Sequence, residues 1–316
     1  MKKQITSIIT NLILFLTGII IIALPDLMKY INKSKLFFDF ITFLRDYPKF
    51  KYVVGIVFTL VGLIGMIFVI ISANIEKKVY IIQKGLKEDF GNIDLNFNQN
   101  AFFNLNKVVY TNICSTKTMN KTLLNVEKKN IYNFYAINAD KKEIAFVSVS
   151  VFPFIVYAGY CIGEAGKKVI YYHYDRNQKK VKKIPYGKIN TNQLSLDEEI
   201  IKSKIRTICI SVSYEVDKKI VKEQFNDSSI YFYKASSVGT ESIKNRKDIE
   251  KIAQQIRDFI SESTEKTNLL LSCPAELCLA IGQKLKSPGL PTIDVYNYNA
   301  KKSLKWNWSI TLDDQF

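Results

Sequence analysis

Residues 269–282 read LLLSCPAELCLAIG, a short apolar run that ends in serine and is followed by a proline and a helical pattern. A brief apolar run bounded in this way indicates a buried β-strand. Pro274 suits the start of a helix, because its missing N–H would have no partner there. Residues 293–298 form the next apolar run. The stretch therefore predicts a β-strand, an α-helix and a second β-strand, the repeating unit of a parallel sheet.

An earlier stretch, residues 146–174, repeats this order. It has an apolar run rich in serine, Pro153, the small pair Ala158-Gly159 and a closing Tyr172-His173-Tyr174, which compares with Tyr296-Asn297-Tyr298 in the later copy. We expect the small residues to let each helix sit close on its sheet. The match favours a duplicated unit, and two independent strand–proline–helix units are the alternative.

Other elements follow from periodicity. Further strands are predicted over residues 131–137, 205–213, 230–234 and 304–311, and a further helix over 248–261. Residues 76–130 are rich in Asn and Lys with weak periodicity, and predict a helical or irregular connector. Strands separated by helices imply a largely parallel sheet, so residues 131–316 are expected to form an α/β domain.

The first 75 residues differ in character. Residues 5–24 and 52–74 carry no charged side chain, and each run is long enough to cross a bilayer core of about 30 Å as a helix. A cleaved signal peptide is the alternative for the first run. Residues 1–75 therefore predict a membrane α-hairpin, two transmembrane helices with a connecting loop.

Charge and cysteine usage bear on the orientation of this hairpin. Basic residues flank both sides of the two runs equally, so the positive-inside rule does not decide. The five cysteines are an odd number within apolar runs, which suits reduced thiols. The expected location is the inner membrane, multi-pass, with the soluble domain in the cytosol.

Small residues recur along the second apolar run. Gly55, Thr59 and Gly62 follow helical spacing, Gly65 lies close to them, and Asn11 offers a polar group on the first run. Small residues let helices approach closely in lipid. Glycine is also common in membrane helices generally, so the two interpretations stay open.

Hydroxyl groups recur where the predicted strands end, and aromatic residues follow two of these ends. In open parallel sheets, ligands bind beyond the carboxyl ends of strands, where helix N-termini favour phosphate. Aromatic rings can stack on bases. For any single serine, helix capping is the alternative. The candidate ligand-binding residues are Ser148, Ser150, Phe152, Ser211, Ser213, Tyr214, Lys234, Ser236, Ser237, Ser272 and Cys273.

Catalytic patterns are weak. The chain has a single histidine, His173, and no phosphate-binding GxxxxGK[ST] or GxGxxG motif. Cys273 and Cys278 have a poor spacing for zinc. The net charge of +16 attracts anionic headgroups or nucleotides without choosing between them. We therefore predict no enzyme activity, no metal and no cofactor, and we interpret Asp197-Glu198-Glu199 as a helix start.

Residues 269–282, together with Val295-Tyr296 and Trp306-Asn307-Trp308-Ser309-Ile310, resemble the end of a SAVED domain. The stretch 146–174 is similar to the first half of that family. The resemblance covers roughly residues 130–316. It implies two fused CARF-like, Rossmann-type units that bind cyclic oligonucleotides made by CD-NTase enzymes in bacterial CBASS anti-phage systems. Some members carry two transmembrane helices in place of a nuclease.

The resemblance implies a cyclic oligonucleotide-activated membrane effector. A ring, most simply a cyclic trinucleotide, would bind across the strand ends and bridge the two halves. Binding would favour a homo-oligomer whose helices disrupt lipid and cause abortive infection, with no DNA partner. A membrane-tethered sensor that recruits a partner and a membrane-anchored hydrolase are the alternatives.

Overall fold

The computed structural model describes Phe15, Thr17 and residues 48–75, 78–84, 107–112, 121–137, 143–164, 168–175, 180–187 and 192–313. The chain divides into two compact units, Met1–Lys77 and Lys78–Phe316.

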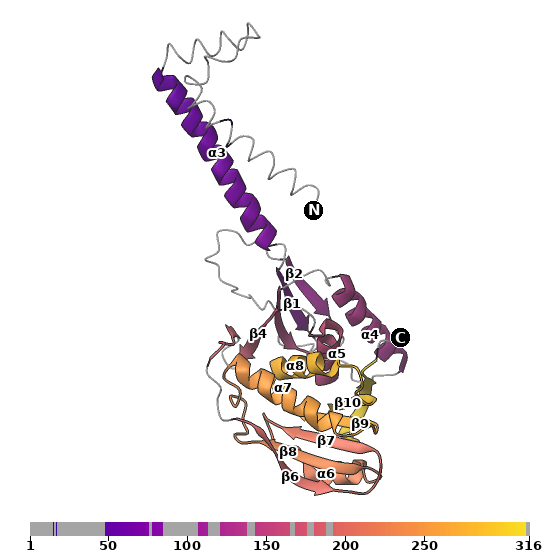
Figure 1. Cartoon of the computed structure of the whole chain (residues 1–316). Helices are drawn as coiled ribbons and strands as arrows, with labels where there is room; N and C mark the ends of the chain where they lie inside the picture. The colour runs from indigo at the N-terminus through magenta and orange to yellow at the C-terminus, as the bar shows by residue number, and fades with distance from the viewer. Residues whose placement is uncertain are drawn as a thin grey trace. The chain divides into compact units, whose positions relative to one another are not determined.

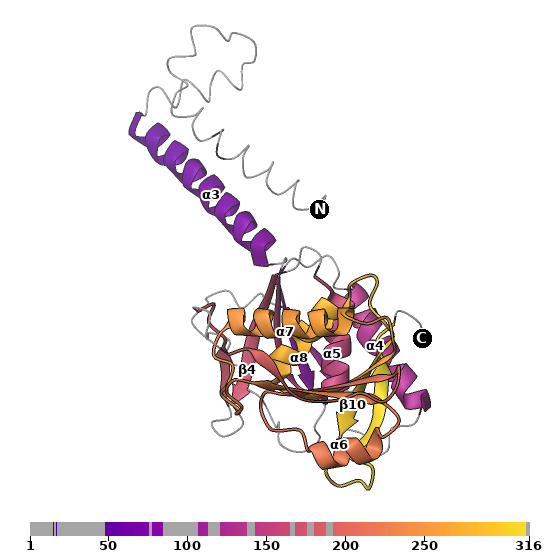
Figure 2. The same ribbon diagram turned by 60° about the horizontal axis from the view of Figure 1, so that its bottom comes forward.

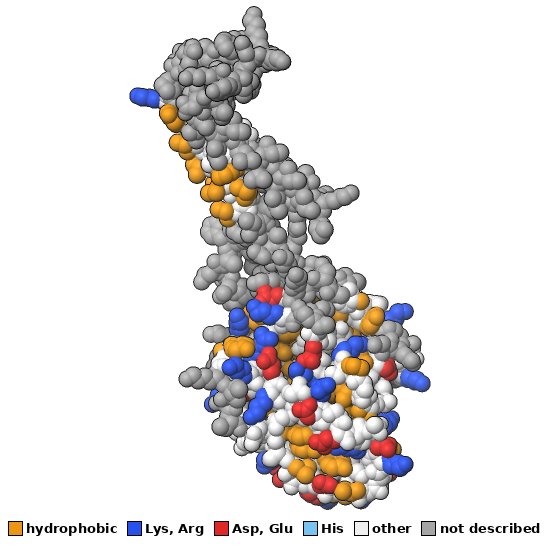
Figure 3. Space-filling model, viewed as in Figure 1, with side chains coloured by type: hydrophobic (Ala, Val, Ile, Leu, Met, Phe, Trp, Pro, Cys, Tyr) orange, Lys and Arg blue, Asp and Glu red, His pale blue; other side chains and the backbone are white. Residues whose placement is uncertain are grey.

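In the first unit, helix α3 spans Pro48–Ile75 (Figure 1). Large apolar side chains such as Ile56 and Ile64 are exposed along it. Figure 3 shows hydrophobic side chains, in orange, along this helix. Gly55 and Gly62 are buried, and the Thr59 hydroxyl donates to the Gly55 carbonyl oxygen over 2.8 Å. The covered face of α3 is thus the face with the small residues. Asn11 lies outside the described residues.

The predicted inner-membrane location is wrong. Among the residues that the structure describes, no helix combines the length and the hydrophobicity that a bilayer crossing requires. The first predicted span, residues 5–24, lies outside the described residues apart from Phe15 and Thr17. The predicted membrane α-hairpin is not found among the described residues. Lipid contact and membrane disruption stay predictions.

The second unit contains two sheets. The first has the order β2-β1-β3-β4-β5, in which four strands are parallel and β5 is antiparallel. Its strands are β1 (Lys78–Lys84), β2 (Lys107–Asn112), β3 (Glu143–Val149), β4 (Lys168–Asp175) and β5 (Lys180–Lys183), with helices α4 (Lys121–Ile137) and α5 (Phe152–Ile162) between them.

The second sheet has the order β11-β10-β9-β7-β8-β6, with antiparallel strands at both edges. Its strands are β6 (Leu194–Ile200), β7 (Arg206–Ser211), β8 (Ser229–Ala235), β9 (Thr267–Ser272), β10 (Ile293–Tyr298) and β11 (Trp306–Thr311). Its helices are α6 (Lys218–Gln224), α7 (Arg246–Ser261) and α8 (Ala275–Leu285).

The two sheets share one topology. Strands β7 to β11 take the places of β1 to β5, and β6 is an addition at the edge beyond β8. The segments β3–α5–β4 and β9–α8–β10 are therefore equivalent. This confirms the duplication predicted from the two strand–proline–helix stretches, and the mixed α/β fold is confirmed with it.

The larger hydrophobic core lies where α5 and α8 pack together between the sheets, and it includes Phe146, Tyr157 and Leu279. A smaller core lies on the opposite face of the second sheet, beneath α6. Figure 2 shows this arrangement, with α7 and α8 on one side of the second sheet and α6 on the other. Small residues serve the contact between helices rather than the predicted contact with the sheets, because Gly159 faces α8 and Gly282 faces α5.

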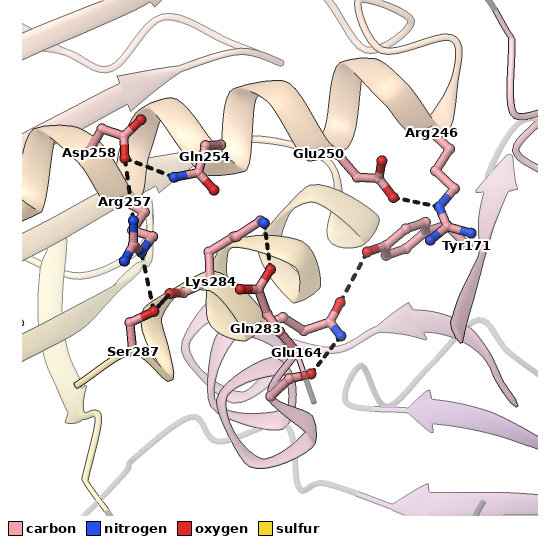
Figure 4. A network of polar contacts seen from close by, with 11 residues as sticks. Glu164, Tyr171, Arg246, Glu250, Gln254, Arg257, Asp258, Gln283, Lys284 and Ser287 are labelled. Carbon is pink, nitrogen blue, oxygen red and sulfur yellow. Dashed lines mark hydrogen bonds and ion pairs between the residues drawn. The ribbon is translucent and has the colours of Figure 1, made fainter. Parts of the chain in front are cut away.

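Polar contacts also join the halves (Figure 4). The Tyr171 hydroxyl of β4 donates to Gln283 Oε1 of α8 over 3.0 Å, and Gln283 Nε2 donates to the Gly163 carbonyl oxygen over 3.0 Å. Lys284 forms an ion pair with Glu164 at 2.5 Å. One side chain of α8 thus satisfies groups from both ends of the α5–β4 connection.

Several predicted elements differ from those observed. Residues 78–84 and 107–112, assigned to a connector, form strands of the first sheet, and residues 131–137, expected as a strand, belong to α4. Asp197-Glu198-Glu199 lies in the edge strand β6 rather than at a helix start.

Candidate functional site

Four polar side chains form a row across the carboxyl end of the second sheet. Ser211 of β7 pairs in register with Ser272 of β9 and with Lys234 of β8, and Lys234 pairs in register with Ser195 of β6. The structure thus brings together three residues predicted from separate strand ends. We call Ser272, Ser211, Lys234 and Ser195 the carboxyl-end row.

The carboxyl-end row faces the α6 side of the sheet. Cys209, Phe232 and Leu270, which precede Ser211, Lys234 and Ser272 by two residues, all belong to the core beneath α6. Side chains two positions apart in a strand lie on the same face. The row therefore continues the apolar surface under α6 outward to the strand ends.

The loop between β7 and α6 is held over this row by backbone hydrogen bonds. The amides of Val212 and Ser213 each donate to the Ser272 carbonyl oxygen over 2.8 Å. The Tyr214 amide donates to Ser272 Oγ over 3.2 Å, and the Val216 amide donates to Ser211 Oγ over 3.0 Å. The Tyr214 side chain itself is 66% exposed. The loop thus presents an aromatic ring to solvent from a fixed backbone.

Three lysines near the row have carboxylate partners. Lys234 forms an ion pair with Glu215 of the same loop. On α6, Lys218 contacts Glu198 at 3.0 Å and Lys222 contacts it at 2.5 Å. The Lys222 ammonium is the main cause of a lowered pKa at Glu198. An anionic ligand at this edge would therefore contact lysines that already form ion pairs with carboxylates of the protein.

Ser236 and Ser237 follow β8 but hold another segment. Ser236 Oγ donates to the Gln193 carbonyl oxygen over 3.1 Å, and the Ser237 amide donates to Asn192 Oδ1 over 3.2 Å. These contacts fix the entry into β6. Both residues are exposed beside the row, and their hydrogen bonds hold the chain before β6 rather than cap a helix.

The candidate residues of the first half lie at the start of α5. The Ser150 amide donates to Ser148 Oγ over 3.1 Å, and Phe152 packs partly buried against the larger core. Ser150 is 7% exposed, and its Oγ has no hydrogen-bond partner among the described residues. An unsatisfied hydroxyl in that position is costly, and such groups often mark functional positions. These three residues lie apart from the row, since α5 covers the larger core rather than the α6 face.

Cys273 points into the protein. Its Sγ lies 3.2 Å from Cys278 Sγ, and both side chains belong to the larger core. Burial is the main cause of a raised pKa at Cys278. The Cys278 thiol is therefore kept neutral near the start of α8.

His173, which sequence reasoning treats as structural, joins the two halves. Its Nδ1 lies 3.1 Å from Oε1 of Glu276, a buried residue in the first turn of α8. The hydrogen bond to Glu276 is the main cause of a raised pKa at His173, and partial burial opposes it. The sequence signal for this contact is an acidic residue directly before the apolar stretch 277–282 of this helix.

Comparison with known proteins identifies the family. The family model for SAVED, described as a SMODS-associated sensor domain fused to various effectors, matches residues 128–312, more than half of the chain. The chain belongs to the SAVED family. No curated protein matches it.

Solved SAVED structures share its fold. The Acinetobacter baumannii Cap4 SAVED/CARF-domain receptor with the cyclic trinucleotide 3′3′3′-cAAA aligns with a TM-score of 0.52 at 9% identity, over 83% of this chain and 59% of that one. The same receptor with 2′3′3′-cAAA gives 0.51 at 10% identity, covering 83% and 58%. The Moraxella osloensis Cap4 receptor gives 0.51 at 11% identity, covering 85% and 59%. This SAVED chain thus spans less than two thirds of the length of those receptors.

Proposed function

We propose that this SAVED protein is the cyclic-oligonucleotide sensor of a CBASS anti-phage system, and that a cyclic trinucleotide is its ligand. The observation that carries the proposal is the carboxyl-end row with the loop above it. Hydroxyls, an ammonium and an exposed aromatic ring converge at the edge of a parallel sheet where ligands of such folds bind.

The chemistry of the row suits a cyclic oligonucleotide. Lys234 offers a cation for a bridging phosphate, and the hydroxyls of Ser211 and Ser272 offer short polar contacts. Tyr214 offers a ring on which a base can stack. Support for this ligand class comes from the shared fold with receptors solved in the presence of cyclic trinucleotides.

The proposal extends to how the signal is used. The ligand binds the assembled form of the protein more tightly than the single copy, so binding increases the population of a homo-oligomer. The described residues bind the cyclic oligonucleotide and do not catalyse a reaction on it. The ligand is therefore released chemically intact. The first-half residues Ser148, Ser150 and Phe152 contribute a second surface to the bound state.

A binding experiment tests this function. We expect calorimetry with purified full-length chain and a panel of cyclic di-, tri- and tetranucleotides, 3′3′3′-cAAA among them, to detect binding of a trinucleotide. Light scattering after size exclusion should show a larger oligomer with that ring. Chromatography of the recovered ligand should return it intact, whereas linear products would contradict the non-catalytic role.

Matched lysine variants place the ligand. Lys234→Ala should weaken binding about tenfold, because a charge-assisted contact to phosphate is lost. Lys204→Ala removes an exposed lysine just before β7, at the opposite edge of the sheet, and should leave affinity within about twofold. Equal effects of the two substitutions, or no binding of any ring, would refute the proposed site or function respectively.

A further inference from the structure

The ion pair between Lys234 and Glu215 differs from the others near the row. Lys218 and Lys222 of α6 bind carboxylates of the edge strand β6, so those pairs join two fixed elements. Lys234 instead binds a carboxylate from the loop after β7. Glu215 is the residue after the exposed Tyr214, and its side chain is 68% exposed.

The backbone on either side of Glu215 is fixed. The Tyr214 amide donates to Ser272 Oγ, and the Val216 amide donates to Ser211 Oγ. The amide of Ser213 is also held by the Ser272 carbonyl oxygen. Glu215 can therefore leave Lys234 by rotation of its side chain alone, with no change in the loop.

We propose that Glu215 is an affinity-determining residue of the ligand site, an internal anion that occupies Lys234 until a phosphate of the ligand replaces it. This inference rests on the proposed function and adds the exchange of anions at Lys234. The ammonium carries a single positive charge, which cannot neutralise both anions, so the phosphate and the carboxylate compete for Lys234. An exposed ion pair contributes little stability, which keeps that exchange accessible.

The exchange lowers the apparent affinity for ligand. Part of the phosphate's interaction replaces an existing one, and the displaced carboxylate remains nearby as a like charge. Removing the charge of Glu215 while keeping its shape should therefore tighten binding. The gain should require Lys234, because both anions act through that side chain.

Calorimetry with full-length variants tests the inference, with 3′3′3′-cAAA as the first probe and sodium pyrophosphate as the second. We expect Glu215→Gln to bind the cyclic trinucleotide about fivefold more tightly than the unaltered chain. Glu223→Gln removes an equal charge from an exposed position on α6 and should change affinity less than twofold. In the double variant Glu215→Gln/Lys234→Ala the gain should disappear.

The outcomes separate this inference from the proposed function. Equal affinities of the Glu215→Gln and Glu223→Gln variants for the cyclic ring overturn the role of Glu215 even when the ring binds. When no ring binds, the pyrophosphate series decides. Tighter pyrophosphate binding by Glu215→Gln alone supports anion exchange at Lys234 and refutes the proposed ligand, while unchanged pyrophosphate binding overturns both.

Discussion

Gly159 of α5 and Gly282 of α8 lie at the crossing of these helices, and each faces a backbone carbonyl of the other helix. A Cβ atom on Gly159 would collide with the carbonyl oxygen of Leu279, and one on Gly282 would collide with that of Val156. Leu279 precedes Gly282 by the same three positions that separate Val156 from Gly159. The contacts at the crossing are thus reciprocal, and they join equivalent helices of two sheets that share one strand order.

Alanine at either glycine should destabilise the fold. Backbone atoms cannot move aside as a flexible side chain can, so Gly159→Ala and Gly282→Ala should each lower the free energy of unfolding by about 1–3 kcal/mol. Urea unfolding followed by circular dichroism measures this change. Gly239→Ala is the control, because a Cβ there meets no atom within 4 Å. Equal stability of all three variants would show that the helices do not meet as described.

The contact between His173 and Glu276 should make stability depend on pH. The pKa of His173 is raised above 6.5, mainly by its hydrogen bond to Glu276. Because the folded chain holds the proton more tightly, this stabilisation is fully present below pH 6.5 and is lost as pH rises through the folded pKa. Relative to His173→Gln, the unaltered chain should therefore lose stability with rising pH in that window.

Proton NMR checks the same contact directly, since His173 is the single histidine and its imidazole signals need no assignment. We expect Glu276→Gln to lower the pKa of His173. Asp175 and Lys182 also act on His173, with opposite signs, and they remain in this variant. An unchanged imidazole titration in Glu276→Gln would argue against the hydrogen bond.

Two serines of the carboxyl-end row should differ in their effect on stability. Ser211→Ala leaves the amide of the buried Val216 without its acceptor and should cost about 1–3 kcal/mol of unfolding free energy. Ser272→Ala should cost less than about 1 kcal/mol, because water can reach the amide of the exposed Tyr214. Chemical unfolding measures the stability of both variants. A larger loss of stability in Ser272→Ala than in Ser211→Ala would contradict the loop geometry.

Ser150→Ala should separate stability from binding. The Ser150 hydroxyl is buried without a partner in the described residues, so its removal should leave stability unchanged or raise it by up to about 1 kcal/mol. Ligand affinity should nevertheless fall about fivefold, because the proposed binding surface of the first half includes Ser150. Ser229→Ala is the matched control for the effect on stability. Ser229 Oγ accepts hydrogen bonds from the amides of Lys202 and Ser203, so removing this hydroxyl should destabilise the folded protein.

The sequence predicts the second sheet well, because its signals are local. Apolar runs ending in serine and a proline at the helix start are visible without knowledge of tertiary contacts. The observed strand β10 has the predicted limits, Ile293–Tyr298, α7 begins and ends within two residues of expectation, and α8 begins directly after Pro274 as predicted. The shared order of the two sheets then follows from the predicted duplication.

The failures have identifiable physical causes. Residues 131–137 are rich in aromatic and apolar side chains, yet Ile131 and Tyr135 are the buried ones, a helical spacing that marks α4. In β6 the acidic residues belong to an exposed edge strand. Such a strand carries charged side chains in place of an apolar pattern, so the sequence does not reveal it.

The candidate site was harder to predict than the fold. Ser211, Lys234 and Ser272 could be named from strand ends, but their register comes only from the assembled sheet. Glu215 gave no signal, because an exposed acidic residue in a loop looks like ordinary surface. Its importance depends on Lys234 of another strand.

Ser272 has a consequence for communication within the molecule. Its carbonyl and hydroxyl oxygens hold the loop that carries Tyr214, and only a short stretch of chain separates it from Glu276, which binds His173 in the other half. One turn of backbone at the beginning of α8 therefore connects the loop that carries Tyr214 with strand β4. The two halves of the domain share a continuous path of hydrogen bonds that needs no contact between the sheets themselves.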